Sequence, residues 1–260
     1  MSVLVEERDG AVVTLTMNRP DRLNALVPEL TLALLETLRR IALDGAIGVV
    51  VLTGAGRGFC AGGDVKSMAG RGEIPLTERA RQLRNSAEVT RLLAEMPQVT
   101  IAAVNGVAAG AGLSLALACD MRIATESARF TAAFLKIGLV SDLGGVYFLR
   151  RLVGTAKARE LFLGGEILGA AQALALGMVN RVVPDDAFPA EAARFAAMIG
   201  AGPRVAQAHL KRILALAETM PLAPWLDQEA IAQAACTLTA DHKEAVRAFA
   251  EKRPPRFEGA

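Results

Sequence analysis

The sequence predicts an α/β fold built from repeated strand–strand–helix units. Two β-branched stretches flank Asp9-Gly10, a turn pair, and therefore predict a hairpin over residues 3–7 and 12–17. In the next segment, 28–43, apolar residues recur at helical spacing before Asp44-Gly45 ends the helix. The same order then returns along the chain. Short strands are expected at 49–52, 99–104, 121–124 and 129–131, with helices at 76–96 and 113–118.

The final third of the chain has a different character. Beyond about Gly145 the strand patterns nearly vanish, and helical segments interrupted by Gly and Pro dominate. Amphipathic stretches such as 188–199 and 205–217 favour packing or subunit contacts over a functional motif. We therefore expect a core over 1–198 and a helical C-terminal region over 199–260.

Composition excludes several classes of function. The 260 residues carry 29 basic and 27 acidic side chains, and the net charge of +2 provides no broad basic surface for nucleic acid or membrane. The two histidines, His209 and His242, lack partner motifs, so neither a His-based triad nor a metal site is expected. No CxxC pair is formed by the three cysteines, Cys60, Cys119 and Cys236. We therefore expect them to be small core residues in a reducing compartment.

The N-terminus provides no targeting signal. Acidic residues at positions 6 and 7 stand where a signal peptide needs an apolar stretch. The apolar runs are all shorter than the roughly 20 residues that span a bilayer. A cytoplasmic protein is expected.

Two glycine-rich loops, at 52–64 and 103–112, each follow a strand and open a helix. Free N–H groups at such positions attract negative charge. Neither loop has the Gly-Lys-Ser/Thr of a P-loop or a dinucleotide-binding pattern. Two backbone donors suit a thioester oxygen that becomes negative as an enolate forms. The alternative is that these glycines only turn the chain.

Several motifs, in order, resemble the crotonase (enoyl-CoA hydratase/isomerase) superfamily over almost the whole chain. The phrase 133–145 is similar in particular to the ring-1,2-epoxyphenylacetyl-CoA isomerase branch. The resemblance implies a spiral of ββα units followed by a helical C-terminal region that builds a homotrimer, or a dimer of such trimers. It also implies an acyl-CoA substrate with no cofactor beyond its CoA moiety. The matching motifs lie at 18–20, 23–26, 59–66, 101–106, 118–120, 122–124, 138–145, 175–179 and 248–253.

The resemblance assigns the oxyanion hole to two backbone N–H groups. The first is that of Gly63, and the second is that of Ala111, where the family more usually has Gly. Alanine keeps the N–H, so donation is expected to survive. Asp64 follows the first donor, and its expected role is to support the loop rather than to react.

Three positions decide the expected chemistry. Ser114 and Phe134 occupy the places where the resemblance expects the two glutamates of a hydratase, whereas Asp142 stands where isomerase branches carry an Asp. One carboxylate suffices to move a proton between two carbons while the hole holds the dienolate. The alternatives are that Asp142 caps the following helix, or that it is a nucleophile as in the dehalogenase branch.

The resemblance implies that basic residues and residues near the C-terminus bind the CoA moiety. The alternative for any one Lys or Arg is a solvated position on the surface. Phe249 and Lys252 match a terminal pair that reaches the neighbouring subunit's CoA in family trimers. The acyl pocket is expected at Met68, Phe134 and Leu139. The CoA candidates in the same chain are Arg22 (or Arg19), Ala61 and Lys66.

The predicted function is therefore an enoyl-CoA isomerase that uses Asp142 as its acid and base. A true hydratase remains the first alternative. A non-catalytic acyl-CoA-binding homologue and a hydrolytic or dehalogenating enzyme are further alternatives.

Overall fold

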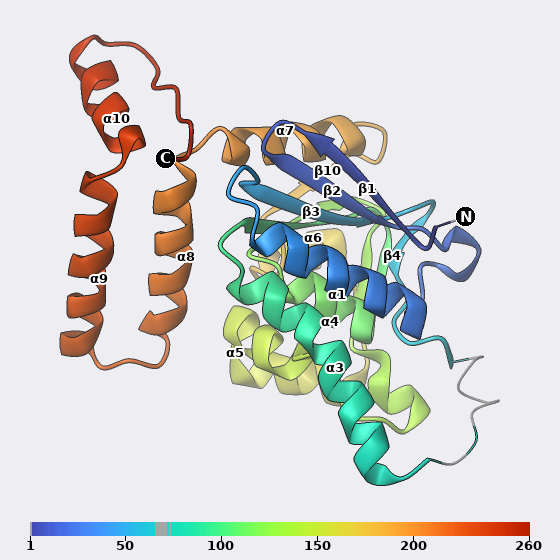
Figure 1. The fold of residues 1–260 in the computed structure, drawn as a ribbon. Helices are drawn as coiled ribbons and strands as arrows, with labels where there is room; N and C mark the ends of the chain where they lie inside the picture. Colours follow the sequence, from blue (N-terminus) through green and yellow to red (C-terminus); the bar gives the residue numbers. More distant parts are fainter. Residues whose placement is uncertain (1, 66–71, 73) are drawn as a thin grey trace.

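The computed structural model describes residues 2–65, 72 and 74–260. Two predicted site residues, Lys66 and Met68, lie outside the described residues. The chain forms a body of sheets and helices, with three helices that extend from it as an arm (Figure 1).

Two sheets form the centre of the body. A six-stranded sheet has the order β1-β2-β3-β5-β7-β10, and a four-stranded sheet has the order β4-β6-β8-β9. The strands are β1 (Leu4–Asp9), β2 (Val12–Met17), β3 (Val49–Gly54), β4 (Gly58–Cys60), β5 (Val99–Val104), β6 (Val107–Ala109), β7 (Met121–Thr125), β8 (Arg129–Thr131), β9 (Ile167–Gly169) and β10 (Arg181–Val183).

Successive strands alternate between the sheets. The pairs β3/β4, β5/β6 and β7/β8 each place their first strand in the larger sheet and their second in the smaller. Within each sheet these strands run parallel, while β1 pairs antiparallel with β2 and β8 with β9. This is the repeated ββα arrangement that the sequence predicts.

The body helices cover both faces of the larger sheet. On α1, the residues at helical spacing from Leu30 to Ile41 are buried, and α7 packs its Phe188 and Phe195 against Val49 and Ile101 on the other face. The helices are η1 (Pro20–Arg22), α1 (Pro28–Ala42), α3 (Leu76–Glu95), α4 (Ala111–Ala118), η2 (Ala133–Ile137), α5 (Gly145–Gly164), α6 (Ala170–Ala175) and α7 (Phe188–Gly200).

Some elements differ from the sequence-based expectation. The three-residue strands β4 and β6 lie inside the segments expected to be glycine loops, and β9 and β10 lie in the region expected to be almost wholly helical. Helix α4 begins at Ala111 rather than at Leu113. Pairing with neighbouring strands fixes such short strands, and a three-residue segment shows no periodicity of its own.

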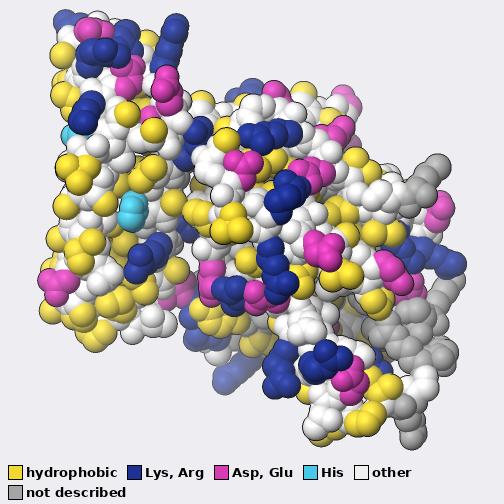
Figure 2. Space-filling view, in the orientation of Figure 1, with side chains coloured by type: hydrophobic (Ala, Val, Ile, Leu, Met, Phe, Trp, Pro, Cys, Tyr) yellow, Lys and Arg dark blue, Asp and Glu magenta, His cyan; other side chains and the backbone are white. Residues whose placement is uncertain are grey.

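The arm consists of α8 (Arg204–Ala217), α9 (Leu222–Thr237) and α10 (Ala240–Ala250), which stand apart from the body in Figure 1. Its start at Arg204 lies shortly after the predicted division at 198/199. Apolar side chains are visible on its outer surface in Figure 2. Exposed apolar residues of the arm include Leu210, Leu214, Leu222, Leu226, Ile231 and Leu238.

The described residues, 2–65, 72 and 74–260, lack two kinds of functional feature. Within those ranges, none of the helices combines the length and apolar character needed to span a bilayer. The same part of the chain contains no cluster of three His, Cys, Asp or Glu side chains suited to hold a metal ion.

Candidate active site

The Gly63 loop forms one wall of the site. A parallel bridge joins Leu26 to Gly63, and its two hydrogen bonds use the Gly62 carbonyl, which accepts from Leu26 N at 2.7 Å, and Asp64 N, which donates to the Leu26 carbonyl at 3.3 Å. In this pairing the N–H of Gly63 itself takes no part. The loop is thus fixed at both neighbours of the predicted donor.

Helix α4 presents the second predicted donor. Ala111 is its first residue, so the Ala111 N–H has no acceptor within the helix. The preceding Gly110 has a φ of 51°, a conformation that glycine adopts without strain, and donates its N–H to Thr131 on β8 at 3.0 Å. The helix therefore begins at a position that the neighbouring strand defines.

The two loops are in close contact. A Cβ atom on Gly62 would lie 2.7 Å from the Ala109 carbonyl oxygen and 3.2 Å from the Ala111 nitrogen. A Cβ on Gly112 would lie 2.1 Å from the Cys60 carbonyl oxygen. Both glycines permit an approach of two backbones that no side chain allows. The structure thus brings the segments of Gly63 and Ala111 together.

Asp64 supports the first loop. Its carboxylate forms an ion pair with Arg19 at 3.2 Å, and Arg19 also donates to the Ala25 carbonyl. This pairing is the structural role expected for Asp64. It also engages Arg19, one of the two residues weighed for contact with CoA, whereas Arg22 at the end of η1 is exposed.

Asp142 lies in the turn that leads into α5. Its side chain is half-buried, and its Oδ1 atom is buried without a hydrogen-bond donor among the described residues. Burial raises the pKa of the Asp142 carboxyl, an effect that its own backbone N–H opposes. Helix α5 begins at Gly145 with Gly144 at the N-cap and no side-chain capping bond, so the Asp142 side chain is not its cap.

The turn that holds Asp142 packs against the first turn of α4. Gly145 donates its N–H to the Asp142 carbonyl at 3.0 Å. A Cβ on Gly145 would lie 2.5 Å from Ser114 Oγ and 2.6 Å from Ser141 Oγ. Ser114, in a position where the resemblance expects a glutamate, therefore lies between the Ala111 end of α4 and the Asp142 turn.

Phe134 provides an apolar wall. It is buried on η2, and its ring would be 3.8 Å from a Cβ on Gly110. It also stacks on Phe162 with ring centroids 6.4 Å apart. Leu139, predicted to line the acyl pocket, donates its N–H to Phe134 but leaves 46% of its surface exposed.

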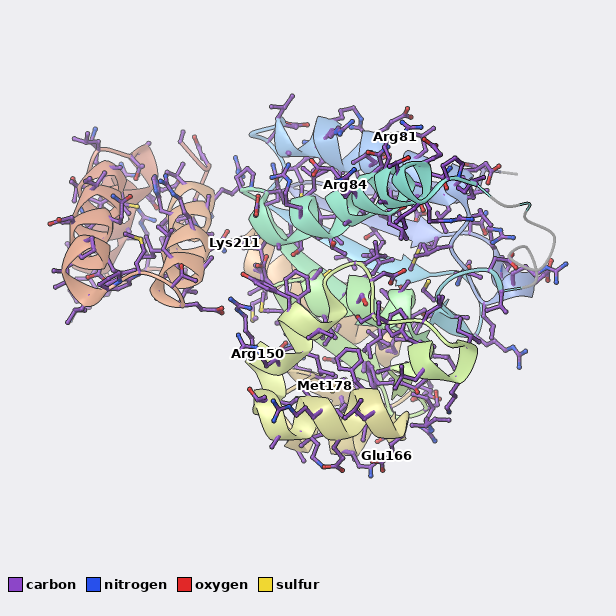
Figure 3. The ribbon with its side chains drawn as sticks, turned by 90° about the horizontal axis from the view of Figure 1, so that it is seen from below. Arg81, Arg84, Arg150, Glu166, Met178 and Lys211 are labelled. Atoms are coloured by element: carbon purple, nitrogen blue, oxygen red, sulfur yellow. The ribbon has the colours of Figure 1, made fainter. Side chains whose placement is uncertain are left out.

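An open pocket of about 440 Å³ lies beside the Asp142 turn. It is lined by Ser141, Gly144, Gly145, Val146, Tyr147, Arg150 and Arg151. Arg151 stacks over the Tyr147 ring at 3.5 Å and pairs with Glu218 at the end of α8, while Arg150 faces the arm (Figure 3). Neither Tyr147 nor Arg151 is among the site residues predicted from the sequence. The sequence signal that could have identified them is Tyr147, the single Tyr of the chain. It stands four residues before Arg151, a spacing that brings two side chains together on a helix.

The remaining CoA candidates do not meet in one chain. Ala61 is half-buried beside the Gly63 loop and donates its N–H to Leu23 at 2.9 Å. Phe249, 88% exposed, and Lys252 are at the end of α10, on the arm. Figure 1 shows this end of the arm far from α4.

The Gly63 loop adjoins the Ala111 start of α4, and the half-buried Asp142 carboxyl is in the turn that packs against this helix, an arrangement suited to a reaction that passes through an oxyanion. The family model for enoyl-CoA hydratase/isomerase matches residues 7–260. The chain therefore belongs to the enoyl-CoA hydratase/isomerase family, the crotonase superfamily, as the sequence motifs predict.

The proteins that this chain is similar to include both isomerases and hydratases by name. The 1,2-epoxyphenylacetyl-CoA isomerase of Escherichia coli (strain K12) is 40% identical over 100% of this chain and 99% of its own. An enoyl-CoA hydratase structure from Bacillus anthracis superposes with a TM-score of 0.93 at 32% identity, covering 99% of this chain and 100% of the other. A second hydratase structure, from Polaromonas sp. JS666, gives 0.93 at 33% identity over 98% and 99%. These structures confirm the fold and leave the choice of reaction open.

Proposed function

We propose that this chain is an enoyl-CoA isomerase that moves a proton between two carbons of an unsaturated or ring-derived acyl-CoA, with Asp142 as its single acid and base. The observation that supports this reading is the half-buried Asp142 carboxyl, whose Oδ1 has no donor among the described residues. Ser114 and Phe134 stand where the resemblance expects the glutamates of a hydratase.

The proposed reaction starts with substrate held by its thioester oxygen. The N–H groups of Gly63 and Ala111 donate to that oxygen, and their hydrogen bonds strengthen as the charge of the dienolate develops. Asp142 takes a proton from one carbon and returns it to another, so the carboxylate is regenerated and no water enters the product. A raised pKa makes the Asp142 carboxylate a stronger base.

Incubation of a 3-enoyl-CoA with the enzyme in D₂O tests the proposal. We expect the wild type to form the 2-enoyl-CoA with deuterium exchange, and Asp142→Asn to lose about 10²- to 10⁴-fold in kcat. Asp142→Glu is a matched variant that keeps the carboxyl, and partial activity is expected. Full activity of Asp142→Asn would overturn the assignment.

Hydration is the second candidate, favoured by the hydratase names of the superposed structures. In that case Asp142 and the neighbouring Ser114 hydroxyl would hold a water molecule. Formation of 3-hydroxyacyl-CoA from crotonyl-CoA, at a rate matching that of isomerisation, would establish hydration in place of the proposed reaction.

Two other outcomes would indicate other functions. Tight CoA binding without turnover of any thioester would indicate a binding protein. A trapped acyl-Asp142 would indicate a nucleophilic mechanism.

We further propose that three copies assemble through the arm and that Phe249 and Lys252 contact the CoA bound by a neighbouring subunit. The exposure of Phe249 at the far end of the arm supports this arrangement. Phe249→Ser and Lys252→Ala are expected to raise KM for an acyl-CoA while leaving kcat unchanged. A wild type that sediments as a monomer, together with an unaltered KM in both variants, would contradict this arrangement.

A further inference from the structure

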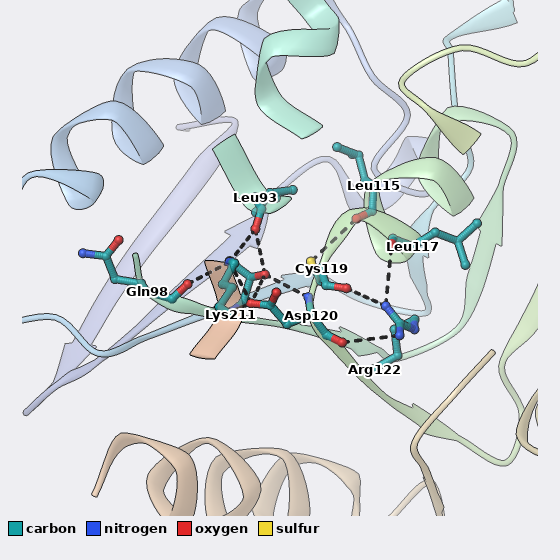
Figure 4. Close-up of polar contacts among 9 residues, drawn as sticks. Leu93, Gln98, Leu115, Leu117, Cys119, Asp120, Arg122 and Lys211 are labelled. Atoms are coloured by element: carbon teal, nitrogen blue, oxygen red, sulfur yellow. Dashed lines mark hydrogen bonds and ion pairs between the residues drawn. The ribbon is translucent and has the colours of Figure 1, made fainter. Parts of the chain in front are cut away.

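Arg122 on β7 is a buried guanidinium surrounded by backbone carbonyls. Only 4% of its surface is exposed. Its Nε donates to the Met178 carbonyl at 2.6 Å. One terminal nitrogen donates to the Cys119 carbonyl at 2.6 Å (Figure 4). Longer contacts reach the carbonyls of Ala116, Leu117 and Asp120 at 3.4–3.5 Å.

Three of these acceptors belong to the C-terminal end of α4. The last carbonyls of any helix lack partners within it. Here Ala116 and Leu117, in the last turn, and Cys119, at the C-cap, all face Arg122 Nη1. Arg122 therefore caps α4 at the end opposite Ala111.

The carboxylate of the acidic neighbour Asp120 is directed to partners other than Arg122. Asp120 directs its carboxylate to Lys211 at 2.8 Å and to the Thr100 N–H at 2.7 Å (Figure 4). Burial lowers the pKa of the Arg122 guanidinium, which nevertheless stays charged at neutral pH. The negative end of the α4 dipole faces this positive charge, and the nearby charge of Asp120 also favours it.

From these contacts we infer that Arg122 is a positioning residue for the oxyanion hole, an inference that rests on the function proposed above. Every residue of α4 is buried, so little solvent screens the helix. By fixing the rear end of a helix of 8 residues, Arg122 holds Ala111 N–H at the front end. Its charge, about 15 Å from the oxyanion by helix length, also favours negative charge there.

The inference predicts a graded loss of rate. At an effective dielectric constant of about 20, a charge at about 15 Å corresponds to a factor of about five to ten in rate. Arg122→Gln keeps donors but loses the charge, so kcat should fall about five- to tenfold with KM changed less than about twofold. Arg122→Lys keeps the charge but not the fork of donors, so about a two- to threefold loss is expected.

A spectroscopic measurement separates positioning from stability. Butyryl-CoA labelled with ¹³C at the thioester carbonyl binds without turnover, and hydrogen bonds to its oxygen move the ¹³C resonance downfield. We expect the wild type to show this shift, Arg122→Gln a smaller one, and Arg122→Lys an intermediate one. The matched control is Gln98→Met, because Gln98 is also buried and donates to carbonyls of Ile41 and Asp44 at the end of α1, which has no site residue. The control should lose stability and keep the shift.

The outcomes distinguish a failure of the oxyanion hole from a failure of the role inferred for Arg122. No shift in the wild type would overturn the oxyanion hole and with it the proposed function. A wild-type shift that persists unchanged in folded Arg122→Gln would overturn the role of Arg122 alone. If Arg122→Gln does not fold, Arg122→Lys is measured in its place. A ¹³C shift and a kcat in Arg122→Lys that both equal those of the wild type would then overturn the role of Arg122.

Discussion

The body and the arm differ in how many of their helical side chains are buried. In the body, all of α4 and one whole face of α1 are inaccessible to solvent. In the arm, whose residues are all described, α8 has no fully buried residue, α9 has Ala232, and α10 has Asp241 and Ala248. An apolar groove of about 710 Å³ between α8 and α9 is lined by Leu210, Ile213 and Leu226 among others. The body therefore has a buried core of its own, whereas the arm has few buried residues and an apolar groove that suits a protein partner.

The largest effect should come from the close approach of the two loops that hold Gly63 and Ala111. Gly62→Ala would place its Cβ 2.7 Å from the Ala109 carbonyl at a φ of 89°. The Gly63 and Ala111 segments must then separate, which we expect to lower kcat about 10²- to 10³-fold, the effect of losing one oxyanion donor. Steady-state kinetics measures it.

Gly45→Ala is the control for that substitution, since nothing lies within 4 Å of the added Cβ. Its kinetics should equal those of the wild type. Wild-type kcat in Gly62→Ala would show that the close approach of the two loops has no role in the reaction.

The next largest effect should fall on the junction of arm and body. Lys211 on α8 faces the body (Figure 3), where it pairs with Asp120 and donates to the Leu93 and Gln98 carbonyls at 3.0 Å. Lys211→Met leaves Asp120 without its cation, and we expect a loss of about 3 kcal/mol in unfolding free energy. Denaturant titration measures this, with the exposed neighbour Arg212→Met as control. Equal stabilities of the two variants would contradict the expectation.

A charge in the arm groove tests whether that surface is covered. Leu226→Lys should change the stability of the isolated chain by less than about 0.5 kcal/mol, because the side chain is 47% exposed. If arms pack on neighbouring chains, the same change should reduce the assembled fraction in analytical ultracentrifugation. Unchanged assembly would place the subunit contact elsewhere.

Acid should act on the arm through Glu244. Hydrogen bonds from Arg253, Arg247 and the Arg256 N–H lower the pKa of its carboxyl. A depressed pKa contributes stability above the ordinary value of 4.5 that is lost as pH falls. Glu244→Gln should therefore have a lower Tm than wild type at neutral pH, with the gap closing in acid. A gap independent of pH would contradict this.

The sign reverses for Asp142 in the body. Its pKa is raised, so its ionisation costs stability as pH rises above the ordinary value of 3.8. Asp142→Asn should then have a slightly higher Tm than wild type at neutral pH and an equal Tm in acid. Thermal unfolding at both pH values measures the difference, and a lower Tm at neutral pH would disprove it.

The long periodic elements could be predicted from sequence, and the contacts between them could not. The hairpin, α1 and β5 follow from local patterns. The pairing of Arg19 with Asp64, 45 positions apart, has no local signature. Whether Asp142 caps α5 depended on where that helix begins, which Gly144 decides. Phe249 and Lys252 lie on the arm, so one chain alone does not bring them to the site.

The burial of α4 has a consequence for the order of folding. Its eight residues are almost all apolar, so the helix gains little from forming alone in water. Its neighbours β4, β5, β6, α3 and α5 come from segments up to a hundred residues apart, and such nonlocal parallel pairing is slow. During refolding, thioester binding should therefore return after most of the secondary structure has formed.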